Sequence, residues 1–201
     1  KTMADAEIRL MVRDLLCMVL EFDNAYRFRM QDIIVEMNKD ELKKNPYKEI
    51  FGALTNADVE YLIVGGVAVN LYGYKRFTGD VDIMLSLEEK NLRKMEALMK
   101  SLGYIQRLPV ELLDMNDVKK VKNWLKTKGM TAYTFISDKG MRLDIDILVG
   151  KSLDFKKFYK KCTKIEVWDM IVPVVSIDDL IEMKREAGRD KDLLDLKELL
   201  E

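Results

Sequence analysis

Apolar and polar residues alternate in the hexapeptide DVDIML that begins at Asp80, as they do in a strand with one buried face. The period of two places Asp80 and Asp82 on one face and the apolar side chains on the other. The stretch MRLDIDILV, which begins at Met141, repeats this pattern with Asp144 and Asp146. The sequence therefore predicts two strands that each bury one face and carry two carboxylates on the other.

The rest of the chain after residue 46 reads as short helices and strands in alternation. Helices are predicted at 47–56, 67–72, 86–102, 116–128 and 155–161, and on both sides of Gly188; strands are predicted at 61–64, near 104–108 and 130–136, and within 164–175. Ser86 and Glu89 have the spacing of a capping box, which predicts Ser86 as an N-cap. These elements predict an α/β (α+β) fold with a small mixed sheet flanked by helices.

The first 45 residues have a different character. Apolar positions within 4–38 recur every three to four residues, with a break near Asp23, and so predict an amphipathic helical hairpin. We expect it to pack on the domain, on a second copy of the chain or on a partner protein. A charged stretch that ends in Asn45-Pro46 predicts the boundary between an N-terminal helical segment, 1–45, and a domain at 46–201.

Composition excludes several classes of chemistry. The chain has 201 residues, no histidine and two cysteines, which lie far apart in sequence. Ser-His and Cys-His nucleophilic catalysis and the usual zinc sites are therefore excluded, so carboxylates must hold any metal. The net charge of −1 gives no overall attraction to nucleic acid or membrane. No apolar run approaches the ~20 residues of a membrane span, and the chain begins without a signal-peptide pattern. We expect a cytoplasmic protein.

The acidic strand follows a glycine turn that suits phosphate. Two carboxylates on one face repel each other unless a cation or a proton lies between them, and Mg²⁺ prefers oxygen ligands of this kind. Gly65-Gly66 comes directly after the predicted strand 61–64, where residues without Cβ atoms allow a close approach to backbone N–H groups. The pair of features indicates a site for a metal and a phosphate.

The spacing of these residues resembles the signature of the DNA polymerase β-type nucleotidyltransferase superfamily. The pattern GGxAxxxxGxxRxTxDxD is matched at eight positions, which are Gly65, Gly66, Ala68, Gly73, Arg76, Thr78, Asp80 and Asp82. The C-terminal stretch from Ser176 to Leu199 is similar to a block found in bacterial and archaeal nucleotidyltransferase-like proteins, including toxins of abortive-infection and toxin–antitoxin systems. The chain has Gly66 where many active relatives carry serine, which removes one hydroxyl for phosphate.

The resemblance implies a set of roles. Three acids, Asp80, Asp82 and Asp146, would hold two Mg²⁺ or Mn²⁺ ions. Periodicity alone leaves Asp144 and Asp146 both open as the third acid, and the resemblance favours Asp146. The phosphates of a nucleoside triphosphate would be bound by the residues Gly65, Gly66, Arg76, Lys184 and Arg189, with Thr78 and Asp192 beside them. The implied reaction moves a nucleoside monophosphate to a hydroxyl of a tRNA, a protein or a small molecule, in a toxin-like role.

Each residue also has a plainer interpretation. Arg76 would pair with a nearby acid, and Thr78 would order the turn before the strand. Lys184 and Arg189 would be solvated on an exposed helix face, with Asp192 paired to Arg189 at a spacing of three. Two alternative functions therefore stay open: a nucleotide-binding or regulatory module without turnover, and a structural partner protein.

Overall fold

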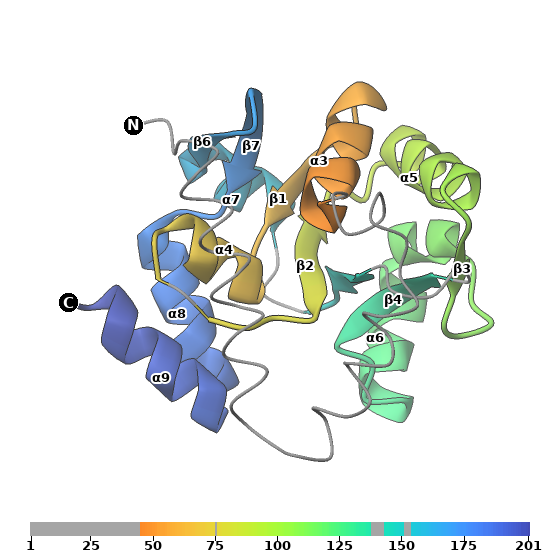
Figure 1. Ribbon diagram of the computed structural model, residues 1–201. Helices are drawn as coiled ribbons and strands as arrows, with labels where there is room; N and C mark the ends of the chain where they lie inside the picture. The colour runs from red at the N-terminus through yellow and green to blue at the C-terminus, as the bar shows by residue number, and fades with distance from the viewer. Residues whose placement is uncertain (1–44, 75, 138–142, 151–153) are drawn as a thin grey trace, which may run out of the picture.

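The computed structural model describes residues 45–74, 76–137, 143–150 and 154–201 (Figure 1). The predicted N-terminal hairpin lies outside these residues, so that element and the domain boundary stay predictions. Among the described residues, no helix has the length and apolar character needed to cross a membrane.

Helices and strands alternate along the described chain. The helices are α3 (Pro46–Asn56), α4 (Gly65–Leu71), α5 (Glu89–Ser101), the 3₁₀ helix η1 (Leu112–Asn116), α6 (Val118–Thr127), α7 (Phe155–Lys161), α8 (Ile177–Ala187) and α9 (Asp190–Leu199). The strands are β1 (Tyr61–Ile63), β2 (Asp80–Leu85), β3 (Tyr104–Gln106), β4 (Ala132–Ser137), β5 (Asp144–Leu148), β6 (Thr163–Val167) and β7 (Met170–Val174). The predicted mixed α/β class is confirmed.

The described strands form one seven-stranded sheet in the order β3-β4-β5-β2-β1-β7-β6. The central pair β2 and β5 is parallel, as is β1 with β7, and the other neighbours are antiparallel. Helices α8 and α9 pack against each other beside α4, while α5 and α6 lie toward the other end of the sheet, near β3 and β4 (Figure 1). The two halves of the molecule therefore flank the acidic strands at the centre.

The core explains the alternation in the sequence. Along β2, Val81 and Ile83 are fully buried, whereas Asp80 and Asp82 on the opposite face are only partly covered. The same alternation holds in β5, where Ile145 and Ile147 are the fully buried residues. Burial of a side chain of this size stabilises a fold by about 2 kcal/mol, so a register shift that exposed these residues would be costly.

The prediction that Ser86 caps the following helix is wrong. The N-cap of α5 is Glu88, and its side chain makes no capping hydrogen bond. The backbone N–H of Ser86 instead donates to the carbonyl of Glu60, which extends the pairing of β1 with β2. The Asn91 side-chain amide also donates to the carbonyls of Ser86 and Glu60. Because these bonds hold Ser86 in the sheet, the helix begins later than the capping pattern predicts. At the tail, Ser176 does cap α8, as predicted.

Candidate active site

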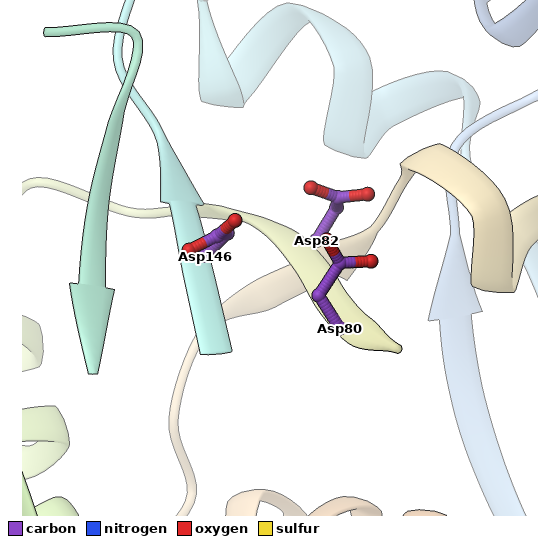
Figure 2. Close-up of side chains that lie close together, drawn as sticks. All are labelled: Asp80, Asp82 and Asp146. Atoms are coloured by element: carbon purple, nitrogen blue, oxygen red, sulfur yellow. The ribbon is translucent and has the colours of Figure 1, made fainter. Parts of the chain in front are cut away.

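Three carboxylates meet at the centre of the sheet. Because β2 and β5 are parallel neighbours in a fixed register, Asp82 lies directly opposite Asp146. The alternation of the strand places Asp80 on the same face as Asp82. Carboxylate oxygens from Asp80, Asp82 and Asp146 all lie within 4.8 Å of one another, and Figure 2 shows the three side chains projecting from the two strands into a common space. Oxygen atoms this close together form a site of the size that a divalent cation requires.

Asp144 is held away from this group. It pairs with Asp80 in the strand register, but its carboxylate accepts a hydrogen bond of 2.6 Å from Arg107. The structure thus brings Asp146 together with Asp80 and Asp82, and it gives Asp144 a cationic partner on the β3 side. Of the two acids that periodicity left open, Asp146 completes the cluster.

Burial and neighbouring negative charges raise the proton affinity of Asp82 and Asp146. Burial raises the pKa of Asp82 to about 6, with further increases from the charges of Asp80 and Asp146, and the N–H of Gly66 and the charge of Lys184 offset part of this. The pKa of Asp146 is raised as well, first by burial, although a hydrogen bond from Thr134 opposes the shift. Its Oδ1 atom is buried without a hydrogen-bond partner among the described residues. A buried carboxylate oxygen without a partner is costly unless a cation or a proton binds there.

Gly65 and Gly66, predicted as a turn before a helix at 67–72, are instead the first two residues of α4, where they form the turn from β1 into the helix. The position of Asp82 requires glycine at the first of them. Gly65 has a φ of +61°, and a Cβ atom on it would lie 1.9 Å from the Oδ2 atom of Asp82. A side chain at this position would therefore both strain the backbone and displace a member of the acidic cluster. The turn and the acids form one packed unit, which a separate reading of the two motifs does not reveal.

The second glycine makes room for Thr78. A Cβ atom on Gly66 would lie 2.9 Å from the Oγ1 atom of Thr78 and 3.0 Å from Cζ of Arg76. The space that a serine side chain would need is thus occupied by a threonine hydroxyl and a guanidinium group. This packing accounts physically for glycine at the position where relatives carry serine.

Thr78 also connects the acids to α3. Its hydroxyl donates a hydrogen bond of 2.8 Å to Oδ1 of Asp80, and its backbone carbonyl accepts one of 3.0 Å from the hydroxyl of Tyr47. Burial raises the pKa of Tyr47 to about 12, and the nearby charge of Asp80 adds to the shift. Tyr47 therefore stays protonated as a donor. Sequence patterns do not single out Tyr47, because nothing in them relates the start of α3 to the acidic strand.

A buried ion network lies beside the acids on the side of α4. Lys184 of α8 is within 2.9 Å of Asp192 and 2.6 Å of Asp195 on α9, and its side chain is only 5% exposed. Arg76 reaches the same Asp195 at 2.7 Å, while Arg189 contacts Asp192 at 2.6 Å. The predicted pairings of Arg76 with an acid and of Arg189 with Asp192 are confirmed. The expectation of a solvated Lys184 is wrong, because α9 folds back over α8 and covers it.

The network keeps Asp192 ionised. Burial alone would raise the pKa of Asp192, but hydrogen bonds from Arg189 and Lys184 outweigh it and lower the pKa to about 2. Asp195 joins Lys184 to Arg76, and therefore joins the tail helices to the loop before β2. Sequence patterns assigned no role to Asp195, although this residue fits the spacing of the C-terminal pattern. Its partners Lys184 and Arg76 lie 11 and 119 residues earlier in the chain.

A cavity opens on the opposite side of the acids. It has a volume of about 300 Å³ and reaches the acidic cluster at Asp146. Its lining comes from the end of β3, the end of α6 and strand β4, with Arg107 and Lys128 as its cations. A larger cavity of about 460 Å³ lies at the other end of β2, around Met84–Glu88, and contains none of the three acids. The smaller cavity is therefore the one placed for chemistry at the cluster.

Comparison with known protein families identifies the family of this chain. Residues 47–199 match the aminoglycoside-2''-adenylyltransferase family. The chain belongs to that family. It is a nucleotidyltransferase, and the resemblance to the superfamily predicted from the glycine turn and the acidic strand is confirmed. The match begins at the first turn of α3 and ends at the last residue of α9, so the family accounts for nearly the whole described fold.

Two solved structures share the fold, and a third aligns less closely. The lincosamide antibiotic adenylyltransferase LnuA, solved with lincomycin, has a TM-score of 0.51 at 15% identity, over 77% of this chain and 94% of that one. The solution structure of the antibiotic-resistance factor ANT(2'')-Ia has a TM-score of 0.51 at 12% identity, over 81% and 84% of the two chains. A nucleotidyltransferase-like protein from Thermotoga maritima aligns at 16% identity with a TM-score of 0.47, over 82% and 95%. None of the curated proteins matches the chain.

Proposed function

We propose that this nucleotidyltransferase moves a nucleoside monophosphate from a nucleoside triphosphate to an acceptor hydroxyl, and that the reaction depends on a divalent cation. The observation that carries the proposal is the convergence of Asp80, Asp82 and Asp146 within 4.8 Å against the Gly65-Gly66 turn. An acidic cluster beside a turn without Cβ atoms can neutralise and align a polyphosphate.

The residues fit a divalent cation. All three candidate ligands are hard oxygen donors, the pKa values of Asp82 and Asp146 are raised, and one oxygen of Asp146 is buried without a partner. Burial first, and then the mutual repulsion of the acids, raise these pKa values, and a bound cation would offset both. Mg²⁺ or Mn²⁺ ions held by Asp80, Asp82 and Asp146 would neutralise phosphate charge and lower the pKa of the acceptor hydroxyl.

The chain's own residues then divide the remaining work. The Gly65-Gly66 turn lets the triphosphate approach the acids closely. Arg189, whose side chain is 60% exposed, is free to contact that triphosphate. Lys184 and Arg76 are paired with Asp192 and Asp195, and they supply fixed positive charge beside the acidic cluster. Thr78 orients Asp80 through its hydrogen bond. Most of the rate enhancement in such a site would come from alignment and charge neutralisation.

Family membership favours a small-molecule acceptor. The family is described by transfer to an aminoglycoside, and LnuA is described as acting on a lincosamide. A tRNA or protein acceptor and a toxin-like role, which the sequence also predicted, have no matching observation in the fold and stay predictions. Location in the cytoplasm stays a prediction as well.

The proposal is tested by transfer of label from each of four α-labelled nucleoside triphosphates, with Mg²⁺ or Mn²⁺, to tobramycin, lincomycin, ribose 5-phosphate, total RNA or the protein itself. We expect transfer that is lost in Asp82→Asn. The matched control is Asp144→Asn, which removes a carboxylate from the same strand as Asp146 but not from the cluster, and we expect it to retain transfer.

Calorimetric titration separates an enzyme from a binding module. We expect nucleoside triphosphate to bind the wild-type chain only in the presence of the divalent cation. Binding that needs no cation, together with no transfer from any triphosphate, would overturn the proposal and leave a nucleotide-binding module of the same fold.

A further inference from the structure

We propose that the acceptor of this enzyme carries a phosphate group close to its reactive hydroxyl, and that Arg107 and Lys128 bind that phosphate in the 300 Å³ cavity beside Asp146. This inference rests on the proposed function, because it names the class of acceptor that the same site would take. It differs from the polycationic acceptors after which the family is described.

Sheet topology separates a triphosphate side from an acceptor side. On one side of β2 lies β1, followed directly by the Gly65-Gly66 turn, with Arg76, Lys184 and Arg189 nearby. On the other side lie β5, β4 and β3, whose ends line the cavity. With the triphosphate on the glycine turn, an acceptor that approaches the same acids must come from the β5–β3 side. Asp146 is the member of the cluster that faces that cavity.

The charges that line the cavity favour an anion. Among the described residues that line it, Arg107 and Lys128 are the cations and Asp146 is the single acid, which the proposed function commits to the divalent ion. Lys128 is exposed and has no carboxylate partner within the described residues. Arg107 pairs with Asp144, but its side chain is 54% exposed, so most of its donor groups can still reach a ligand. A polycationic aminoglycoside would face two like charges here without a carboxylate to receive its amines.

The remaining lining and the size of the cavity suit a small phosphorylated sugar. Leu108, Met130 and Ala132 provide apolar surface, and Thr131 and Thr134 provide hydroxyl groups. A volume of about 300 Å³ is at the lower end of the range for small-molecule sites. Arginine and lysine together are the usual pair for recognition of a phosphate, the first through its planar fork and the second as a point charge.

A phosphate beside a hydroxyl occurs both in a small sugar phosphate and at the end of a nucleic acid. The cavity adjoins α6, whose exposed lysines Lys119, Lys122 and Lys126 also have no carboxylate partner in the described part of the chain. Lys119 lies about 13 Å along the helix from Lys128, a distance that a sugar phosphate does not span. Substitution of Lys119 therefore distinguishes the two sources.

The test uses the full chain with ¹³C-labelled methionine methyl groups, because Met130 lines the cavity. Ribose 5-phosphate, ribose and tobramycin are titrated separately in the presence of Mg²⁺, and the Met130 resonance is followed. We expect ribose 5-phosphate to shift this resonance and to bind at least tenfold more tightly than ribose or tobramycin.

Arg107→Gln with Lys128→Gln should weaken the binding of ribose 5-phosphate at least tenfold, whereas Lys119→Gln should leave it unchanged. A short RNA oligonucleotide whose binding also depends on Lys119 would assign the phosphate to a nucleic acid, and equal binding in Lys119→Gln would assign it to a small compound.

The inference is overturned if tobramycin shifts Met130 more strongly than ribose 5-phosphate, or if the double variant binds ribose 5-phosphate as wild type does. Nucleoside triphosphate binding is measured on the same samples. Loss of the Met130 response with triphosphate binding intact would overturn this inference alone. A retained Met130 response without cation-dependent triphosphate binding would overturn the proposed function instead. An unchanged methyl spectrum outside the cavity shows that the variants fold.

Discussion

Cations flank the acidic cluster on both sides, and the protein holds the two sets very differently. On the α8–α9 side, Lys184 is 5% exposed and contacts two carboxylates, one of which also binds Arg76. On the cavity side, Arg107 is 54% exposed with a single partner, and Lys128 has none in the described chain. Charges that carboxylates already hold and cover contribute to structure, whereas exposed charges with open donors are available to a ligand. Lys184 and Arg76 thus serve the fold on one side, whereas Arg107 and Lys128 have donors open to a ligand on the other.

The largest effect that this contrast predicts is on stability. Lys184→Met removes the cation that lies between Asp192 and Asp195, and leaves buried carboxylates with less compensation. We expect a loss of about 3–5 kcal/mol in the free energy of unfolding, measured by urea denaturation. Lys128→Met is the matched control, and its change should stay within about 0.5 kcal/mol. Equal effects of the two substitutions would remove the distinction between the sides.

The pH dependence of stability sharpens the same point. The pKa of Asp192 is lowered from 3.8 to about 2, so the folded state binds fewer protons here than the unfolded state between these values. The contribution to stability is therefore present above about pH 4 and is lost as the pH falls through 2; it amounts to about 2 kcal/mol. We expect the stability difference between wild type and Asp192→Asn to shrink over this range. A difference that is constant from pH 5 to pH 2 would contradict the assignment.

The close packing of Gly66 against Thr78 predicts that a substitution at one position can compensate for a substitution at the other. Gly66→Ser places a Cβ atom 2.9 Å from the Thr78 hydroxyl and 3.0 Å from Arg76, so something must move. We expect it to destabilise the protein by about 1–3 kcal/mol. Thr78→Ala in the same chain should recover part of that loss, because it clears the hydroxyl and the γ-methyl. Additive effects in thermal denaturation would show that the two side chains do not compete for one space.

Between the two sides, the acids themselves predict a competition between protons and cations. Because the pKa of Asp82 is raised to about 6, a proton must leave before a divalent cation binds below that pH. The affinity for Mn²⁺, measured by electron paramagnetic resonance of the free ion, should fall by about tenfold per pH unit below pH 6. Affinity that does not change between pH 5 and pH 7 would contradict the raised pKa.

The smallest effect is expected for the exposed pair. Arg107→Ala removes a salt bridge of 2.6 Å to Asp144, with both side chains partly exposed. We expect a change in stability of at most about 1 kcal/mol, in contrast to the loss for Lys184. A larger loss by urea denaturation would show that Arg107 belongs with the structural cations.

Sequence patterns predicted the centre of the fold more accurately than its contacts. The bounds of β2 and α7 agree with the predicted ones. For β2 the reason is that a period of two over six residues is a local signal. The choice of Asp146 over Asp144 needed the family resemblance, since both acids lie on one face of β5. Only the register of β5 on β2 and the position of Arg107 separate them physically.

What sequence could not supply is contact between distant segments. Lys184 has the pattern of an exposed helix residue, and it is buried only because the turn at Gly188 returns α9 across α8. Asp195 and Tyr47 take part through partners 119 and 31 residues away. Ser86 has the spacing of a cap, but Asn91 and Glu60 hold it in the sheet. Each of these follows from tertiary packing, which overrides a local preference.

The hydroxyl of Tyr47 connects the start of α3 to the acidic cluster. This hydroxyl donates a hydrogen bond to the Thr78 carbonyl, and the Thr78 hydroxyl donates one to Asp80. Two hydrogen bonds therefore join α3 to the acids. Residues 1–44 enter the described fold at Asn45, only two positions before Tyr47. A partner that displaced Asn45 on binding would therefore shift Tyr47 and Thr78, and through them the position of Asp80, a proposed metal ligand.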